Sequence, residues 1–147
     1  RTRSNTSLSI KARSLPMRTV APMSVPVGAT GSVSVVVGEA DLAIAVGSGD
    51  VPVLATPRVI ALCEAATCRA VAPHLPDGST TVGVRVEIEH LRATPVSGRV
   101  TATAEVVEVD GRRHTFAVQA IDEQGEIARG VVVRVLVDRD RFMSSLG

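Results

Sequence analysis

The spacing of apolar residues changes along the chain, from strand-like alternation to a helical repeat and back again. Valines at every second position of 33–37 predict a first strand. Residues 57–72 are apolar over most of a helix circumference, which predicts a helix surrounded by other structure. Thr56 is the predicted N-cap and Pro57 the first helical residue, and the prolines and glycine of 73–78 end the helix.

The segments after this helix return to a two-residue period. Residues 80–91 alternate, with charged side chains on one face and an apolar row on the other. That row is Val82, Val84, Val86 and Ile88, and His90 continues it. The dipeptide Asp110-Gly111 is a strong hairpin signal. It joins the second of four predicted strands to the third, and the last three strands cover 97–109, 112–121 and 127–137.

The order strand, helix, then four strands joined by short turns predicts an α+β fold. An antiparallel five-stranded sheet wrapped around one long helix is the hotdog architecture. Residues 38–55, rich in glycine and containing a proline, are predicted to form a loop or lid. One helix cannot cover both faces of such a sheet. The remaining apolar face and the exposed edge strand therefore predict a homodimer, with a higher oligomer as the alternative.

Composition divides the chain into three parts. Residues 1–26 hold five basic residues and no acidic one, with many Ser, Thr and Pro. That is typical of a flexible arm or a transit peptide, and equally of an extension ahead of a true start at Met17 or Met23. The remainder supports a single domain over 27–142, with 143–147 as a C-terminal tail.

Charge and residue usage exclude several function classes. A net charge of +1 and only two aromatic residues give no basis for a nucleic-acid partner. No apolar run approaches the roughly 20 residues of a membrane span. Cys63 and Cys68 fall on different faces of the predicted helix, which disfavours a disulfide or a metal site. We therefore expect free thiols, no bound metal and a cytoplasmic location.

Three residues could carry chemistry. Glu64 is the one carboxylate of the predicted helix, so it either lies on a solvated face or reaches a cavity that uses it. His90 ends an apolar row. This position is compatible with a core histidine that is hydrogen-bonded to a backbone carbonyl, and equally with a catalytic histidine. Capping alone would explain Thr56. The other histidines, His74 and His114, are predicted to lie at the surface.

Together the three side chains could hydrolyse an activated acyl group. The carboxylate of Glu64 attacks the carbonyl or activates water, the imidazole of His90 moves a proton to the leaving group, and the hydroxyl of Thr56 orients them. The helix N-terminus would stabilise an oxyanion or a phosphate. However, eight helical residues rise about 12 Å, so Thr56 and Glu64 of one helix cannot meet. Either Glu64 comes from a second subunit, or the chain near Thr56 is not helical.

Three segments of the chain resemble the hotdog acyl-CoA thioesterases related to fluoroacetyl-CoA thioesterase. They are "ATPRVIALCEAATCRAVAPHLPDG", "VGVRVEIEHLRATPVSGRVTATAEV" and "VDGRRHTFAVQAIDEQGEIARG", and the resemblance covers 27–142. In that family a Thr before the helix, a Glu eight residues later and a His 26 further on are catalytic, with a Gly seven before the His near the substrate. The resemblance implies these roles for Thr56, Glu64, His90 and Gly83, and implies hydrolysis of an acyl-CoA thioester. Strict alternation puts Gly83 and His90 on opposite faces unless a bulge intervenes, so we expect Gly83 to contribute backbone.

The expected substrate is a short or medium acyl-CoA. The predicted lid lacks the aromatic residues of the fluoroacetyl-specific member, which argues for a different or broader acyl group. CoA is part of the substrate, and no further cofactor is expected. Its phosphates call for a basic rim, for which the candidates are Arg58 and Arg92, followed by Arg69, Arg112 and Arg113. A hydratase or dehydratase on the same fold and a non-catalytic acyl-CoA or acyl-carrier binding protein remain as alternatives.

Overall fold

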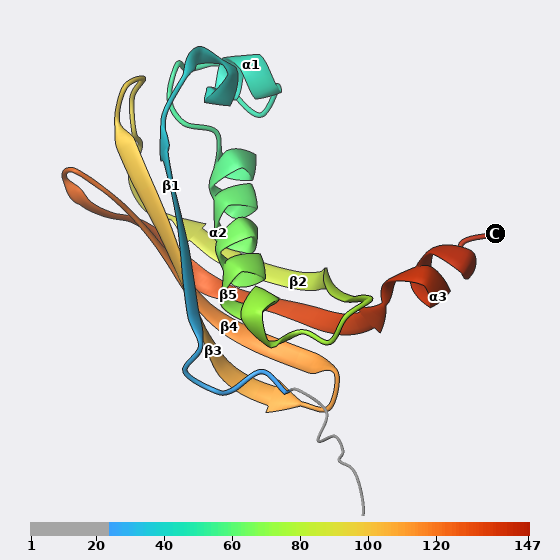
Figure 1. Cartoon of the computed structure of the whole chain (residues 1–147). Coiled ribbons are helices and arrows are strands. Elements are labelled where there is room, and N and C mark those ends of the chain that lie inside the picture. The colour runs from blue at the N-terminus through green and yellow to red at the C-terminus, as the bar shows by residue number, and fades with distance from the viewer. Residues whose placement is uncertain (1–23) are drawn as a thin grey trace, which may run out of the picture.

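A curved five-stranded antiparallel sheet wraps around one long helix in the computed structural model, which describes residues 24–147 (Figure 1). The strands lie in the order β1-β3-β4-β5-β2, so β1 and β2 are the two free edges. Their bounds are Thr30–Val36 for β1, Ser79–His90 for β2, Arg99–Asp110 for β3, Arg113–Asp122 for β4 and Gly125–Asp138 for β5. The predicted α+β hotdog architecture is confirmed.

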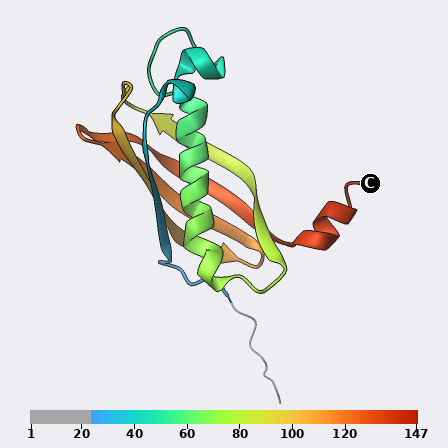
Figure 2. The same cartoon turned by 45° about the horizontal axis from the view of Figure 1, so that its top comes forward.

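The long helix, α2 (Thr56–Val71), lies across the concave face of the sheet (Figure 2). Residues 38–55 contain short helical turns and isolated β-bridges, without the long regular element that their glycines and proline argued against, and gather at the N-terminal end of α2 (Figure 1). Those turns are η1 (Glu39–Asp41) and α1 (Ala43–Val46), and η2 (Ala72–His74) follows α2. A further helix, α3 (Arg139–Ser144), was not predicted and projects from the end of β5. The predicted N-terminal arm falls almost entirely outside the described residues. None of the helices within 24–147 has the length and apolar character needed to cross a membrane.

The core is filled by aliphatic side chains and one aromatic ring. Phe116, Leu54 and Ile127 are among the largest fully buried side chains. The strands β3 and β4 alternate buried and exposed residues along most of their length, so each presents one face to α2. The core side of the sheet therefore follows the predicted two-residue pattern.

The outer face of the sheet is more polar than predicted. On β3 and β4 the residues that alternate with the buried row are mostly threonines and other polar side chains, including Thr101, Thr103, Glu105, Thr115 and Gln119. Exposed apolar residues such as Val107 and Val131 are scattered among them. A second apolar face is therefore not the reason to expect a dimer. The unpaired edge of β2 remains a reason to expect a dimer.

A bulge in β2 breaks the predicted apolar row. The register of β2 against β5 shifts between Gly83 and Arg85, and the extra residue, Val84, is 51% exposed. Val86 and Ile88 pack against the core, but Val84 does not. Because one inserted residue reverses the alternation, Gly83 and His90 both face α2. The expectation that they lie on opposite faces is thus corrected by the bulge.

Two predictions about single residues have different outcomes. His114 was predicted at the surface, but it is 2% exposed and its Nδ1 lies 2.9 Å from the carbonyl oxygen of Arg112. The cysteines are free as expected, with Cys63 buried and Cys68 exposed. Burial and the neighbouring charge of Glu64 raise the pKa of Cys63 to about 11, so this thiol stays protonated and unreactive at neutral pH.

Asp122 organises the turn at the end of β4. Its carboxylate accepts hydrogen bonds from the Thr94 hydroxyl at 2.9 Å, the Gln124 backbone at 2.7 Å and the Arg92 guanidinium at 2.7 Å. Burial alone would raise the pKa of Asp122, but these three donors outweigh it and hold the pKa below 3.8. The stabilisation therefore persists above pH 3.8 and is lost as the pH falls through the lowered pKa.

We expect Asp122→Ala to lower the free energy of unfolding by about 2–3 kcal/mol, because a buried hydroxyl and a charged group lose their acceptor. Urea unfolding measures this change. The control is Asp50→Ala, an exposed aspartate in the lid whose loss is expected to change stability by less than about 0.5 kcal/mol. Equal effects of the two substitutions would contradict the role of Asp122.

Candidate active site

The helix start places a free hydroxyl at one end of α2. Ala55 is the N-cap residue, and its carbonyl accepts from the backbone of Arg58 at 3.0 Å and of Val59 at 3.1 Å. The predicted N-cap role of Thr56 is therefore wrong: Thr56 is the first helical residue and its side chain caps nothing. Instead its Oγ1 lies 2.8 Å from Nδ1 of His90, at the end of β2. The structure thus brings together two of the three residues grouped from the sequence, while their catalytic role stays a prediction.

His90 is held as a neutral imidazole with one free nitrogen. Burial lowers its pKa below 6.5, and a contribution of opposite sign from the backbone of Arg92 offsets only part of this effect. While Nδ1 contacts Thr56, the buried Nε2 has no hydrogen-bond partner within residues 24–147. A buried ring nitrogen without a partner is costly unless a ligand or reacting group uses it. Nε2 is therefore the ring nitrogen that the described part of the chain leaves unpaired.

A cavity of about 310 Å³ opens beside this pair. It lies between the start of α2, the end of β2 and the lid, and both Thr56 and His90 line it. The lid contributes small and aliphatic side chains to its wall, among them Ala43, Gly49, Val51, Val53 and Leu54. The cavity thus joins a hydroxyl–imidazole pair to an apolar surface without an aromatic ring.

An ion pair fixes the lid to α2. The Nε of Arg58 lies 2.8 Å from Oδ1 of Asp41, whose other oxygen accepts from the Gly38 backbone at 2.8 Å. The hydrogen bond from Gly38 and the charge of Arg58 outweigh desolvation and lower the pKa of Asp41. Arg58 therefore holds the lid and is not among the residues that line the cavity. Arg92 does line the cavity, although its guanidinium is paired with Asp122.

Glu64 has a partner that sequence analysis missed. Its Oε2 lies 3.1 Å from NH1 of Arg134, a β5 side chain that is only 10% exposed. Arg134 is held in turn by Thr81, through Nε to the hydroxyl at 2.9 Å and NH2 to the carbonyl at 3.0 Å. This pairing explains a carboxylate on an apolar helix. The available signal was an arginine inside the otherwise apolar run "VVVRVLV".

Gly83 provides the space that Glu64 occupies. A Cβ atom on Gly83 would lie 2.5 Å from Oε2 of Glu64 and 3.3 Å from NH1 of Arg134. Any side chain here would displace the carboxylate. Gly83 therefore adjoins Glu64 and makes room for its carboxylate through its missing side chain. Its place near a substrate and the contribution of its backbone stay predictions.

The structure divides the predicted catalytic group into two half-sites. Thr56 and His90 meet at the N-terminal end of α2, whereas Glu64 lies with Gly83 and Arg134 about two turns along the helix. The helix is regular from Thr56 onward, so the alternative of a non-helical start is wrong. Eight residues still separate the hydroxyl from the carboxylate by about 12 Å along the axis. Within residues 24–147 no group of three or more His, Cys, Asp or Glu side chains is placed to hold a metal ion.

The sheet wrapped around one helix defines a hotdog-fold protein, and its solved structural neighbours at about 30% identity are thioesterases. Residues 37–140 match the family model described as fluoroacetyl-CoA-specific thioesterase. Because this match covers most of the chain, the protein belongs to that family.

Individual relatives agree with this assignment. The fluoroacetyl-CoA thioesterase of Streptantibioticus cattleyicolor is 38% identical over 90 residues, 61% of this chain and 65% of that protein, so the match spans slightly less than two thirds of the relative. A crystal structure of a fluoroacetyl-CoA thioesterase superposes with a TM-score of 0.78 at 30% identity, covering 84% of this chain and 96% of that one. A thioesterase superfamily member from Thermus thermophilus has the same TM-score, 0.78, at 24% identity, over 88% of this chain and 93% of its own. This last likeness concerns the fold alone.

We expect the imidazole of His90 to titrate below pH 6.5 in the folded protein, because its site disfavours the charged form. An NMR titration of the histidine ring protons, with the His90 signal identified by its loss in His90→Asn, measures the midpoint. The unfolded chain takes up this proton first as the pH falls, so the contribution of His90 to stability is present above pH 6.5 and is lost below it. A midpoint at or above 6.5 would contradict this environment.

Proposed function

We propose that the protein hydrolyses a short or medium acyl-CoA to the free acid and CoA. The observation that carries this proposal is the contact of Thr56 with His90 inside a cavity at the N-terminus of α2. Membership of a thioesterase family supports the reaction class. The reaction adds water across the thioester and draws only on side chains of the protein, with CoA as part of the substrate.

The proposed roles follow from the chemistry of each group. Glu64 is the nucleophile or the general base: it attacks the thioester carbonyl to give a mixed anhydride that water then hydrolyses, or it takes a proton from the attacking water. The tetrahedral oxyanion forms near the positive end of α2. As the carbon–sulfur bond breaks, the electron pair leaves with sulfur. The proton lost by the water molecule passes through the imidazole of His90 to the thiolate, so His90 returns to its neutral form. Thr56 fixes the imidazole through Nδ1, and Nε2, which has no partner within residues 24–147, is the nitrogen proposed to transfer the proton.

The site is proposed to be shared between two copies of the chain. Within one copy the helix keeps Glu64 away from Thr56, and both half-sites adjoin the same edge strand, Glu64 beside Gly83 and Thr56 beside His90. If two copies pair their β2 edges antiparallel about a two-fold axis, the Gly83 region of one strand comes next to the His90 end of the other. A homodimer would then assemble two complete sites.

The composition of the lid favours an acyl group other than fluoroacetyl, or a broader range of acyl groups. Its cavity wall is made of small and aliphatic residues, and the chain has no aromatic residue in 38–55. Such a wall favours a saturated alkyl chain through its apolar area. The free cysteines suit a reducing compartment, so we place the reaction in the cytoplasm.

We expect the protein to release free CoA from acetyl- to octanoyl-CoA, and Glu64→Gln to lower kcat by at least about 100-fold, because an amide is neither base nor nucleophile at neutral pH. A thiol reagent follows CoA release. The matched control is Glu108→Gln, an exposed glutamate on β3, which should keep full activity.

Other outcomes of this assay distinguish the alternatives. A hydratase would act on an enoyl-CoA without releasing thiol. A binding protein would bind acyl-CoA equally well before and after the Glu64 substitution. Turnover that survives Glu64→Gln would remove this residue from the mechanism.

We expect a mixture of Thr56→Ala and Glu64→Gln chains to regain activity that neither has alone. In a shared site, one of the two sites of the mixed dimer combines an intact Thr56 with an intact Glu64, so it recovers up to half of the wild-type dimer's activity. Co-expression with two different affinity tags and purification on both measures this directly. A mixed dimer as inactive as its parents would show that each site lies within one chain.

A further inference from the structure

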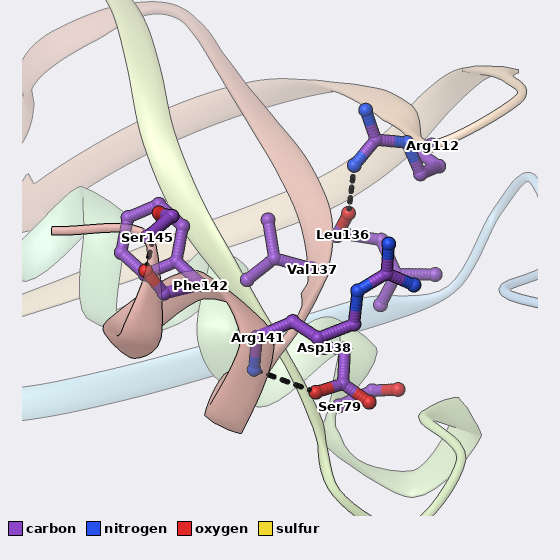
Figure 3. Close-up of a pocket in the computed structure, with 8 residues that line it drawn as sticks. All are labelled: Ser79, Arg112, Leu136, Val137, Asp138, Arg141, Phe142 and Ser145. Carbon is purple, nitrogen blue, oxygen red and sulfur yellow. Dashed lines mark hydrogen bonds between the residues drawn. The ribbon is translucent and has the colours of Figure 1, made fainter. Parts of the chain in front are cut away.

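A second cavity, of about 620 Å³, lies at the far end of β2 from His90. It is formed where the β3–β4 hairpin, the end of β5 and α3 meet. Figure 3 shows Arg112 and Phe142 at its two ends, with Arg141 between them. Neither the proposed reaction nor the packing of the core uses these residues.

The two arginines of this cavity keep their charge available. NH1 of Arg112 donates to the carbonyl of Leu136 at 3.1 Å, which is a neutral acceptor and leaves the guanidinium charge unpaired. The guanidinium of Arg141 forms no ion pair or hydrogen bond with any residue of 24–147. The single acidic side chain of the lining, Asp138, accepts from the Arg141 backbone at 3.0 Å as the N-cap of α3. The cavity therefore carries a net positive charge.

The other rim arginines named from the sequence are engaged elsewhere or lie off this cavity. Arg58 and Arg92 are each paired with a carboxylate, and Arg69 donates to the carbonyl of Ser32. Of the five arginines proposed for phosphate binding, only Arg112 lines a cavity together with a second free guanidinium. The chemistry that fits is a phosphate group held by two arginines and a planar base against the ring of Phe142.

This cavity is far from the Thr56–His90 pair of its own chain but would lie closer to that pair in a second copy. In one chain, the eleven steps of β2 from Ser79 to His90 span about 36 Å, so the cavity and the Thr56–His90 pair lie at opposite ends of the strand. Antiparallel pairing of two β2 edges shortens this separation: with His90 of one copy beside the bulge of the other, the Ser79 end of that second strand lies about five residues, or roughly 16 Å, away.

We propose that this cavity binds the phosphorylated adenosine end of the CoA whose thioester is cleaved at Thr56 and His90 of the partner subunit. The inference rests on the proposed thioesterase function and on the shared dimer. Arg112 and Arg141 hold the phosphates, and Phe142 contacts the base. Each subunit thus supplies the thioester site of one substrate and the nucleotide site of the other.

The test compares acyl-CoA with the matching acyl-pantetheine, which lacks the nucleotide. The Arg112→Gln and Arg141→Gln double variant should raise KM for acyl-CoA at least tenfold with kcat unchanged, and leave KM for acyl-pantetheine unaltered. The matched control is Arg99→Gln, an exposed β3 arginine outside the cavity. An unchanged KM for acyl-CoA in the double variant, or an equal rise for both substrates, would overturn the assignment.

Direct binding separates this inference from the proposed reaction. Calorimetry should show that adenosine 3′,5′-bisphosphate binds the wild-type protein. Its affinity should be at least tenfold lower for the double variant, and lower than wild type for Phe142→Leu. Wild-type protein that does not bind the bisphosphate overturns the nucleotide site even if it cleaves acyl-CoA. Absence of thioester cleavage together with charge-dependent bisphosphate binding would refute the proposed reaction alone.

Mixed dimers test which subunit supplies the nucleotide site. In a mixed dimer, one chain carries Thr56→Ala and the other carries the double substitution. The intact Thr56–His90 pair then belongs to the double-variant chain, and the cavity next to it belongs to the Thr56→Ala chain and is also intact. We expect its KM for acyl-CoA to equal that of the wild type. A KM as high as that of the double variant would place the nucleotide site in the same chain as the thioester site.

Discussion

The geometry of one straight helix is the constraint on which the rest of the structure depends. Because α2 is regular from Thr56, the hydroxyl at its first residue and the carboxylate of Glu64 are held about two turns apart. Each group then finds its own partner across the sheet, His90 in one case and Arg134 in the other. The helix thus separates two half-sites, Thr56 with His90 and Glu64 with Arg134. These groups could act on one substrate only if a second copy of the chain brought them together.

The bulge in β2 is what allows one strand to serve both half-sites. Without the extra residue at Val84, either Gly83 or His90 would point away from α2. The bulge is also the main reason why part of the site could not be predicted. Local features of the sequence singled out Thr56, Glu64 and His90 as candidates and predicted most of the strand pattern, because these features depend only on neighbouring residues. An inserted residue in a strand leaves no comparable signal, since "VGVRV" reads as an unbroken alternation.

The other wrong or missing predictions, for Arg134 and His114, concern residues whose surroundings come from segments distant in the sequence. Arg134 was overlooked because its role depends on Glu64, 70 positions away, and His114 was placed at the surface because its burial depends on how the sheet closes over it. The element order, the single helix and the lid were predictable, because turn residues and apolar spacing encode them locally. The partners of the charged side chains were not, because they are chosen only when the sheet closes around α2.

The bulge also restricts how two β2 edges could pair, which bears on the shared site. Regular backbone remains from Arg85 to His90, and one register of antiparallel self-pairing there would set Arg85 opposite Glu89 of the partner subunit, an attractive pair of charges. In that register Glu87 meets its own symmetry copy, which costs some stability, while His90 lies beside the bulge of the other strand. Gly83 faces α2 at that bulge and leaves room for Glu64. This register would therefore also bring the carboxylate of one copy toward the imidazole of the other.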